Sequence, residues 1–581
     1  MPKISRIKFL KNLTFVALAI IMVRLFFIQI VEHDEWVAKA DDQHTLLETI
    51  TAKRGEIYMM DGDNPVAVVQ NQTTYSIIID PAVTDKEALK TVLNTHAKQY
   101  ISADIDEVYN IEGLRYYIVA RNVPYSTAVK IAEEELNSVW LKESNQRVYP
   151  EGELASSLLG FVNADGIGQY GTEGSLNKIL SGKDGSLKTI ADINKIALSI
   201  GKDNVRIPAE DGKDVVLSVD RGLQSGTEAI LNNHISWTPA TNAAALIMDP
   251  NTGKVITMAS LPNFDPGNYG NVKDASVYLN QTTEIPYEPA SICKNFAFSA
   301  AINEGKMDSE TIFYNKGYEE VDGWTIWNAE QRSTLNDHDL TMKTALYWSL
   351  NTGSIHALKL LGDNPNEITQ VGRERLYDYY HNKFRLGRAT GIELIEAEGY
   401  IEDPNEGWGR NSTYANMTFG QNLGITMIQT ATAFSSVING GYWITPHIVE
   451  GTLKDGVITP LERETERDQI LKAETSEMMR DMLINNRSYK AREGIDREGY
   501  AVGGKSGTAQ VIVDGAYDDS MGNLVGSYIG FIGPEGEMPK YVIMVKMWGE
   551  GEALSGGEAQ DLFDELSNYV IDYLKIRPAG Q

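Results

Sequence analysis

A serine and a lysine stand three positions apart in the segment Ser291-Ile-Cys-Lys294. Pro289 before them is a helix-start signal, and the apolar run Phe296–Ala301 after them predicts a buried helix. Because residues i and i+3 share one face of a helix, the Ser291 hydroxyl and the Lys294 amine are expected to touch. A lysine whose pKa is lowered by burial can accept the serine proton and create a nucleophile. A capping serine beside a solvated lysine would give the same pattern, so it is weak evidence by itself.

A second hydroxyl and an amide stand two residues apart in Ser349-Leu-Asn351, which is 58 positions further along the chain. Side chains at this spacing can point into the same cleft. An ordinary loop is the alternative interpretation.

The third motif is the glycine-rich segment Gly503-Gly-Lys-Ser-Gly-Thr-Ala509, in which Lys505 follows Ser349 by 156 residues. Gly499–Ser506 fits the phosphate-loop pattern Gly-x-x-x-x-Gly-Lys-[Ser/Thr] letter for letter. A phosphate loop follows a buried strand and opens a helix, whereas here the preceding residues are mostly charged and the following 510–513 predicts a strand. The motif by itself favours an ordinary glycine-rich turn, and the sharper interpretation is that Lys505 is a carboxylate anchor on a strand.

The elements around these motifs predict an α/β (α+β) domain of about 340 residues with a mainly antiparallel sheet flanked by helices. Two short strands flank the turn Asp249–Gly253, and further strands are expected near the end of the chain, before an amphipathic helix. The expected elements are strands 243–248, 254–260, 526–532 and 541–548 and helix 559–574, and a strand 214–219 and a helix 221–234 are expected just before this domain.

The part that precedes this domain, from Asp41, has mixed and strand-rich signals. Tyr75–Ile79 predicts a strand, and Lys86–Lys98 predicts a helix. Seven glycines between Gly160 and Gly185 indicate tight turns in an extended region. A separate β-rich domain is therefore expected here.

The amino terminus predicts a membrane anchor. Leu13–Val31 is apolar except for Arg24 and a few uncharged polar residues, and it is just long enough to cross a hydrocarbon core of ~30 Å. Basic residues precede it and acidic residues follow it, so the positive-inside rule places residues 1–12 in the cytoplasm and the rest outside. A cleaved signal peptide is the alternative, since Ala38-Lys-Ala40 has a small-x-small form, but the apolar run exceeds a usual signal core.

Composition excludes several classes of function. The 52 Lys and Arg against 80 Asp and Glu give a net charge of −28, which argues against a general nucleic-acid binder. One cysteine allows no internal disulfide, no multi-cysteine zinc site and no iron–sulfur cluster. The eight histidines include no His-Glu-x-x-His pair. We therefore expect no metal and no cofactor.

Together, the three motifs in this order resemble those of the class B penicillin-binding proteins, the monofunctional peptidoglycan DD-transpeptidases. The resemblance covers nearly the whole chain, from the cytoplasmic tail and single anchor onward. It implies the tail 1–12, a transmembrane helix 13–31, a pedestal (dimerisation-type) domain 41–232 and a transpeptidase domain 242–576. Further landmarks that resemble the family are Arg147-x-Tyr-Pro150, Gly171-Thr-Glu173, Pro262-Asn-Phe-Asp-Pro266, Gly420-Gln421 and Asn439-Gly-Gly441.

The resemblance also implies residue roles. Ser291 would attack a D-Ala–D-Ala carbonyl with Lys294 as base, and the backbone N–H groups of Ser291 and Thr508 would form the oxyanion hole. Ser349 would relay a proton with the support of Lys505, and Asn351 would hold the donor amide. The terminal carboxylate would be bound by Lys505, Ser506, Gly507 and Thr508.

Three positions depart from the family pattern. Ala290 stands where glycine usually precedes the nucleophile, and Cys293 stands where methionine or phenylalanine is usual. Met59-Met-Asp-Gly62 replaces the expected Asp-Arg-x-Gly of the pedestal. We expect Cys293 to be a small core residue, and we expect the departures to affect local geometry and not the chemistry.

The resemblance implies peptidoglycan stem peptides and β-lactams as ligands, and a polytopic glycosyltransferase and divisome proteins as partners. Total length and the modest size of the inserts favour division over elongation. The alternatives are a membrane-bound serine enzyme that hydrolyses or senses β-lactams, a non-catalytic scaffold, and a bifunctional glycosyltransferase–transpeptidase. The last is disfavoured because the pedestal leaves no room for a second catalytic domain.

Overall fold

The computed structural model describes most of the chain as two compact units, each treated separately here. One unit is Met1–Arg54 with Ser181–Gly212, and the other is Gly55–Leu180 with Lys213–Gln581. The small-x-small site 38–40 lies outside the described residues. These are 6–36, 45–190, 205–407, 409–488, 495–510, 512–513, 516–517 and 523–580.

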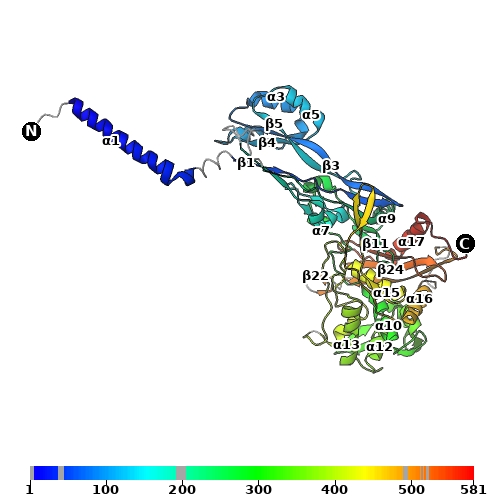
Figure 1. Cartoon of the computed structure of the whole chain (residues 1–581). Helices are drawn as coiled ribbons and strands as arrows, with labels where there is room; N and C mark the ends of the chain where they lie inside the picture. Colours follow the sequence, from blue (N-terminus) through cyan, green and yellow to red (C-terminus); the bar gives the residue numbers. More distant parts are fainter. Residues whose placement is uncertain are drawn as a thin grey trace, which may run out of the picture. The chain divides into compact units, whose positions relative to one another are not determined.

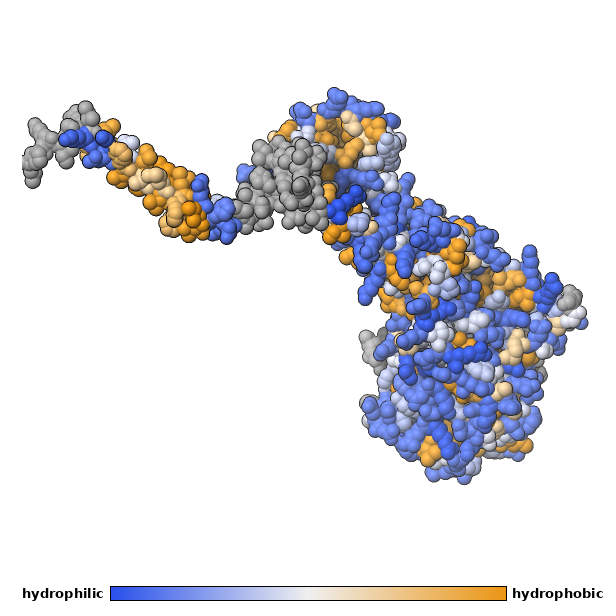
Figure 2. Space-filling view, viewed as in Figure 1, coloured by the Kyte–Doolittle hydropathy of each residue, from blue (hydrophilic) through white to orange (hydrophobic). Residues whose placement is uncertain are grey.

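The first unit contains the apolar helix. Helix α1 (Arg6–Phe26) continues into a π-helical turn (Phe27–Val31), and Lys8–Val31 is long and apolar enough to span a membrane. Its surface is mostly apolar (Figure 2). The helix begins before Leu13 because the basic residues ahead of the apolar run are also helical. Strands β1 (Thr45–Ile50), β8 (Gly185–Ile190) and β9 (Val205–Ile207) form an antiparallel sheet with β8 in the centre.

The second unit begins with a sheet built around the long strand β3 (Asn64–Ile79). β2 (Ile57–Asp61), β4 (Tyr117–Val123) and β5 (Val139–Val148) all pair with it antiparallel. Helices α3 (Lys86–His96) and α5 (Tyr125–Glu133) bury their apolar faces in the same core as β3 and β4. This sheet continues through β10 (Asp214–Asp220), which pairs with β2 in parallel and with β18 (Val449–Lys454) antiparallel.

The expectation of an extended region between Gly160 and Gly185 is wrong for the stretch between Gly171 and Leu180, which is mostly helical. The segment contains helices α7 (Gly171–Ser175) and α8 (Asn177–Leu180), and its only paired strands before β8 are two-residue pieces among the described residues. Several of the glycines are required by close packing, because a Cβ on Gly171 would lie 2.4 Å from the Leu158 carbonyl oxygen.

A five-stranded antiparallel sheet forms the centre of the rest of this unit (Figure 1). Residues that alternate along each strand face two separate cores. On one face, α9 (Arg221–Trp237) and α17 (Gly556–Tyr573) pack over Ala243, Ile543 and Val545. The strands, in spatial order, are β12 (Val255–Leu261), β11 (Asn242–Met248), β25 (Tyr541–Trp548), β24 (Leu524–Pro534) and β21 (Tyr500–Gln510).

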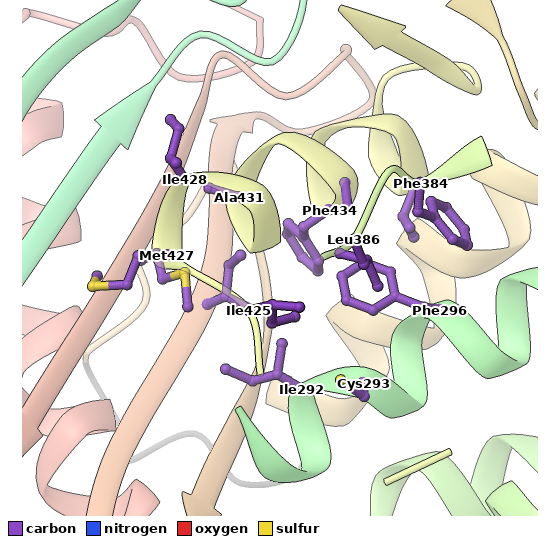
Figure 3. Packing of buried hydrophobic residues seen from close by; sticks show 14 of the residues in the cluster. Ile292, Cys293, Phe296, Phe384, Leu386, Ile425, Met427, Ile428, Ala431 and Phe434 are labelled. Carbon is purple, nitrogen blue, oxygen red and sulfur yellow. The ribbon is translucent and has the colours of Figure 1, made fainter. Parts of the chain in front are cut away.

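The other face of the sheet carries the helices that surround the sequence motifs. Helices α10 (Lys294–Asn303), α12 (Asn351–Leu361), α15 (Met427–Ile438) and α16 (Ala473–Ser488) share one core with it. Figure 3 shows Ile292, Cys293 and Phe296 within this core. Cys293 is fully buried, and burial raises the pKa of its thiol well above the ordinary value, as expected for a small core residue. The predicted mixed α/β fold is confirmed.

Candidate active site

Ser291 lies in a 3-10 turn (Ala290–Cys293) that leads directly into α10. The residue before it, Ala290, has φ +48°, a left-handed conformation that favours glycine. Gly420 packs against it so closely that a Cβ there would lie 2.0 Å from the Ala290 carbonyl oxygen. The departure Ala290 thus occupies a strained backbone position, and the Gly420-Gln421 landmark supports the nucleophile turn from the other side.

Lys294 is the first residue of α10, and its side chain is fully buried. Its Nζ atom lies 2.9 Å from Ser291 Oγ, as the i, i+3 spacing predicts. The same atom lies 2.7 Å from the Ser349 backbone oxygen, 3.1 Å from Ser349 Oγ and 2.9 Å from Asn351 Oδ1. Lys294 is therefore the point at which the first two motifs meet.

Ser349 and Asn351 lie at the turn between α11 (Met342–Tyr347) and α12. Ser349 has φ +56°, which directs both its backbone oxygen and its hydroxyl towards Lys294. The Asn351 amide is oriented from both ends, because its Nδ2 donates to the Trp327 backbone oxygen at 2.9 Å while its Oδ1 accepts from Lys294. The side chains of this motif are thus fixed by partners far away in sequence.

The third motif lies within strand β21, at the edge of the five-stranded sheet. Lys505 is fully buried there, and its Nζ donates to the Ser506 backbone oxygen at 2.9 Å. A Cβ on Gly507 would lie 2.4 Å from the Pro289 carbonyl oxygen, so only glycine lets the strand pass directly beside the nucleophile turn. This geometry contradicts the phosphate-loop interpretation, since Gly504–Ser506 are strand residues and not a loop that opens a helix.

Thr508 and Ser506 line the same strand near its more exposed end. The Thr508 Oγ1 accepts a hydrogen bond from the Gly556 backbone N–H at 2.9 Å, at the start of α17. Ser506 is half-buried and Thr508 is exposed. The structure therefore brings all eight predicted site residues into three adjoining segments.

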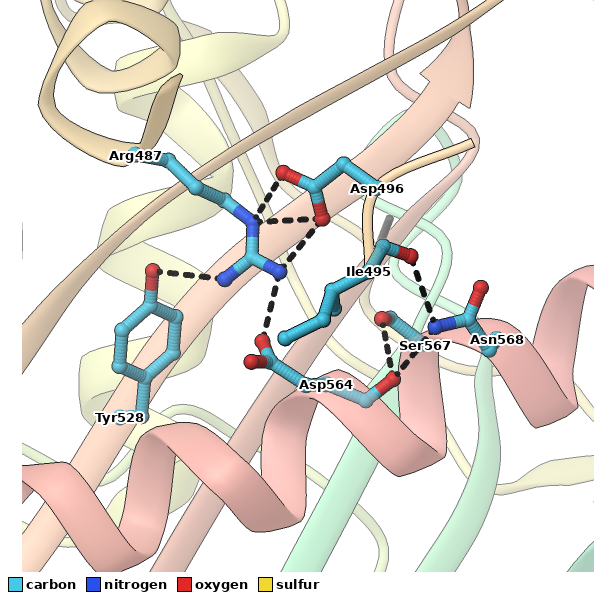
Figure 4. Close-up of polar contacts among 7 residues, drawn as sticks. All are labelled: Arg487, Ile495, Asp496, Tyr528, Asp564, Ser567 and Asn568. Carbon is cyan, nitrogen blue, oxygen red and sulfur yellow. Dashed lines mark hydrogen bonds and ion pairs between the residues drawn. The ribbon is translucent and has the colours of Figure 1, made fainter. Parts of the chain in front are cut away.

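Behind β21 lies a polar network that the motifs did not indicate (Figure 4). Arg487, at the end of α16, donates from Nη2 to Asp496 Oδ1 and to Asp564 Oδ1, both at 2.6 Å, and from Nη1 to the Tyr528 hydroxyl at 3.4 Å. The neighbouring Asn486 donates to the Gly504 backbone oxygen at 2.6 Å. These contacts hold the end of α16 against β21, the strand that carries Lys505, and against β24. The residues are far apart in the sequence, and no motif indicates the network.

A buried carboxylate joins the first sheet region to the five-stranded sheet. Glu228 on α9 accepts from the Ala155 backbone N–H at 2.9 Å and from the side chains of Gln224 and Asn263 at 2.8 Å and 2.7 Å. Burial raises its pKa. Asn263 belongs to the Pro262–Pro266 landmark, so this hydrogen bond ties the landmark to α9.

Comparison with known proteins assigns the chain to a family. Residues 243–568 match the penicillin binding protein transpeptidase domain, and residues 49–217 match the penicillin-binding protein dimerisation domain. The chain belongs to the class B penicillin-binding proteins, which confirms the resemblance inferred from the motifs. The predicted enzyme class, a serine-type D,D-transpeptidase, is confirmed as well.

Relatives of the same class cover most of the chain. Stage V sporulation protein D of Bacillus subtilis is 30% identical over 91% of this chain and 80% of its own length. The peptidoglycan D,D-transpeptidase FtsI of Escherichia coli is 26% identical over 97% of this chain and 90% of its own length. The fold is similar to that of penicillin binding protein 3 from Mycobacterium tuberculosis in complex with aztreonam, with a TM-score of 0.67 and 23% identity over 92% of this chain and 98% of that one.

Proposed function

We propose that this protein cross-links peptidoglycan stem peptides through an acyl-serine intermediate and that β-lactams acylate the same serine. The observation that carries the proposal is the set of contacts at Lys294, whose Nζ joins Ser291 Oγ, Ser349 and Asn351 within 3.1 Å. A single buried amine placed between two hydroxyls is suited to moving a proton from one to the other.

In the first half of the reaction, Ser291 Oγ attacks the carbonyl carbon of the penultimate D-Ala of a donor peptide. The hydroxyl proton passes to Lys294 Nζ, and the backbone N–H groups of Ser291 and Thr508 stabilise the oxyanion. The C–N bond then breaks, and the leaving D-Ala amine receives a proton through Ser349, with Lys505 in support. The product is an ester between Ser291 and the donor peptide.

In the second half, an acceptor amine attacks the ester carbonyl and restores the Ser291 hydroxyl. The lysine accepts the acceptor's proton and returns one to the serine, so protons balance over the cycle. Asn351 orients the donor amide, and Lys505, Ser506, Gly507 and Thr508 bind the terminal carboxylate. The buried position of Lys505 supports this role, because a desolvated ammonium attracts an anion more strongly than an exposed one.

A labelling experiment tests the assignment of the nucleophile. Fluorescent penicillin should label the full-length wild type and should not label Ser291→Ala. Ser309→Ala is the matched control, since Ser309 lies on a surface turn beside Glu310 and should leave labelling unchanged. Labelling of Ser291→Ala at the wild-type rate would reject the nucleophile.

We further propose that α1 anchors the protein in the cytoplasmic membrane with the amino terminus in the cytoplasm and the catalytic region outside. The length and apolar character of Lys8–Val31 support an anchor, and the basic residues before it support the orientation. The family resemblance favours a role in division, and by the same resemblance we propose a polytopic glycosyltransferase and divisome proteins as partners. A fluorescent fusion should form bands at midcell; lateral patches would indicate elongation.

The rate of deacylation separates the proposed function from a β-lactam-hydrolysing enzyme. A transpeptidase retains the acyl-drug because its natural acceptor is an amine and not water. We expect the penicilloyl-protein to persist for hours after free drug is removed. Turnover within seconds would favour the hydrolase alternative instead.

A further inference from the structure

A lysine that the proposed reaction does not use lies in the middle of the central sheet. Lys546 on β25 is 1% exposed, and its strand neighbours on the same face are the apolar Val542 and Met544. Burying an ammonium in such a place is costly, and lysine is almost never fully buried without a partner. Packing alone therefore does not explain why a lysine occupies this buried position.

The register of the sheet places Lys546 in the same row as Gly507 of the proposed carboxylate site, two strands away. Lys546 is opposite Ser527 on β24, and Ser527 is opposite Gly507 on β21. Opposite residues of antiparallel strands share one face of a sheet, so the three lie in one row on the face that bears Ser291. Two strand spacings separate the Cα atoms of Lys546 and Gly507 by about 10 Å.

The other contact of Lys546 leads to the nucleophile turn. Its Nζ lies over the ring of Tyr287, 4.8 Å from the centroid, which is the geometry of a cation–π interaction. Tyr287 is four residues before Ser291, and its backbone exchanges two hydrogen bonds with Ile425, at 3.0 Å and 3.1 Å. Lys546 thus contacts the segment that leads to Ser291, and it lies two strands away from the strand that carries Lys505.

Among the residues that the structure describes, no charged group is a resolved cause of the pKa shift of Lys546. On β24 and β11 its opposite residues are Ser527 and Ala244, which do not titrate. Burial raises the pKa of both Tyr287 and Cys293 well above their ordinary values, so both stay neutral near pH 7. Lys505 is the cation on the same face, in the adjacent row of the sheet. Burial alone lowers the pKa of Lys546 to about 7.

We propose that Lys546 is a positioning residue whose positive charge, held against Tyr287, strengthens the binding of an anionic donor or β-lactam by the strand Lys505–Thr508. The proposal rests on the proposed function of that strand. Protonated Lys546 adds a second positive charge on the same face of the sheet as the anion site, and the low-dielectric interior screens it little. Deprotonated Lys546 loses both this field and the cation–π contact.

The test compares second-order acylation rate constants of full-length wild type and Lys546→Met in detergent between pH 5.5 and 9. The wild type should react about three- to tenfold faster than the variant at pH 6, and the ratio should fall towards one by pH 9. Penicillin carboxylates stay ionised throughout this range, so the change belongs to the protein. Lys546→Gln should behave like Lys546→Met, while Met547→Leu, on the same strand but the opposite face, should follow the wild type.

Two controls keep the outcomes distinct. Tyr287→Phe preserves the ring and should retain the pH-dependent ratio, whereas Tyr287→Leu should reduce it. A ratio between wild type and Lys546→Met that is the same at every pH, or a ratio of one throughout, would overturn the proposal. Failure of the proposed function is separate, because it would appear as labelling of Ser291→Ala whatever the result at Lys546.

Discussion

Lys294 and Ser349 are joined twice, through the backbone oxygen of Ser349 at 2.7 Å from Nζ and through its hydroxyl at 3.1 Å. The backbone contact depends on the left-handed φ of Ser349 and does not depend on its side chain. Removal of the hydroxyl therefore leaves Lys294 anchored, whereas removal of the lysine leaves four oxygen contacts without their donor.

From this we expect a definite order of effects on acylation. Lys294→Ala should lower the penicillin acylation rate constant by about 10³-fold or more, and Ser349→Ala by about 10–10²-fold, since a positioned acid or base contributes about 10²–10⁴-fold. Stopped-flow acylation with a fluorescent penicillin measures both. Equal losses in the two variants would show that the hydroxyl, and not the backbone oxygen, positions the lysine.

A buried ion pair ties the two pedestal landmarks together. Arg147 Nε donates to Glu173 Oε1 at 2.7 Å, with 7% and 0% of the side chains exposed. Glu173→Gln should lower the free energy of unfolding by about 3–5 kcal/mol, because it leaves a buried guanidinium without its counter-charge. Lys183→Gln is the control, because the Lys183–Glu210 pair is exposed and should contribute less than about 1 kcal/mol. Chemical denaturation compares them, and similar small losses in both would contradict the structural role.

Ala290, the residue before the nucleophile, has a strained backbone, and its replacement is expected to stabilise the protein. Ala290→Gly should raise the free energy of unfolding by about 0.5–1 kcal/mol, because its φ of +48° costs alanine more than glycine. Ala297→Gly, in the middle of α10, should lower it by about 1 kcal/mol, since helical φ favours alanine. Thermal unfolding of the two variants should shift in opposite directions. A loss of stability in Ala290→Gly would show that the turn bears no strain.

Lys546 predicts a pH-dependent gain of stability on mutation. Its pKa is about 7 in the folded protein and 10.5 when unperturbed, so below pH 7 both states are charged and the folded state bears the full cost of burial. Lys546→Met should therefore be more stable than wild type by about 2–4 kcal/mol at pH 6–7, with the difference shrinking as pH rises towards 10. Unfolding of the detergent-solubilised full chain measures this. A constant difference from pH 6 to 10 would show that the lysine is not buried as an ammonium at neutral pH.

Part of the fold follows from local patterns in the chain. The strand Tyr541–Trp548 has the bounds that its apolar run predicts, and the hairpin around Asp249–Gly253 forms between β11 and β12. The helical stretch between Gly171 and Leu180 was missed because a glycine required by a close backbone approach is indistinguishable in sequence from one required by a turn. A lysine within an apolar strand was visible at position 546, but nothing local shows which elements cover it.

The sequence by itself determined the class of protein and the contact between Ser291 and Lys294, because a three-residue spacing on helical backbone brings side chains together whatever surrounds them. Only the tertiary structure decided that Ser349, Asn351 and β21 meet at that lysine, since this depends on strand register and on the packing of α10 and α12. The tertiary structure also decided three further features: the backbone strain at Ala290, the ion pair between Arg147 and Glu173, and the burial of Lys546. The burial of apolar surface and the register of strands bring together groups that are distant in the chain, and no local preference encodes those distances.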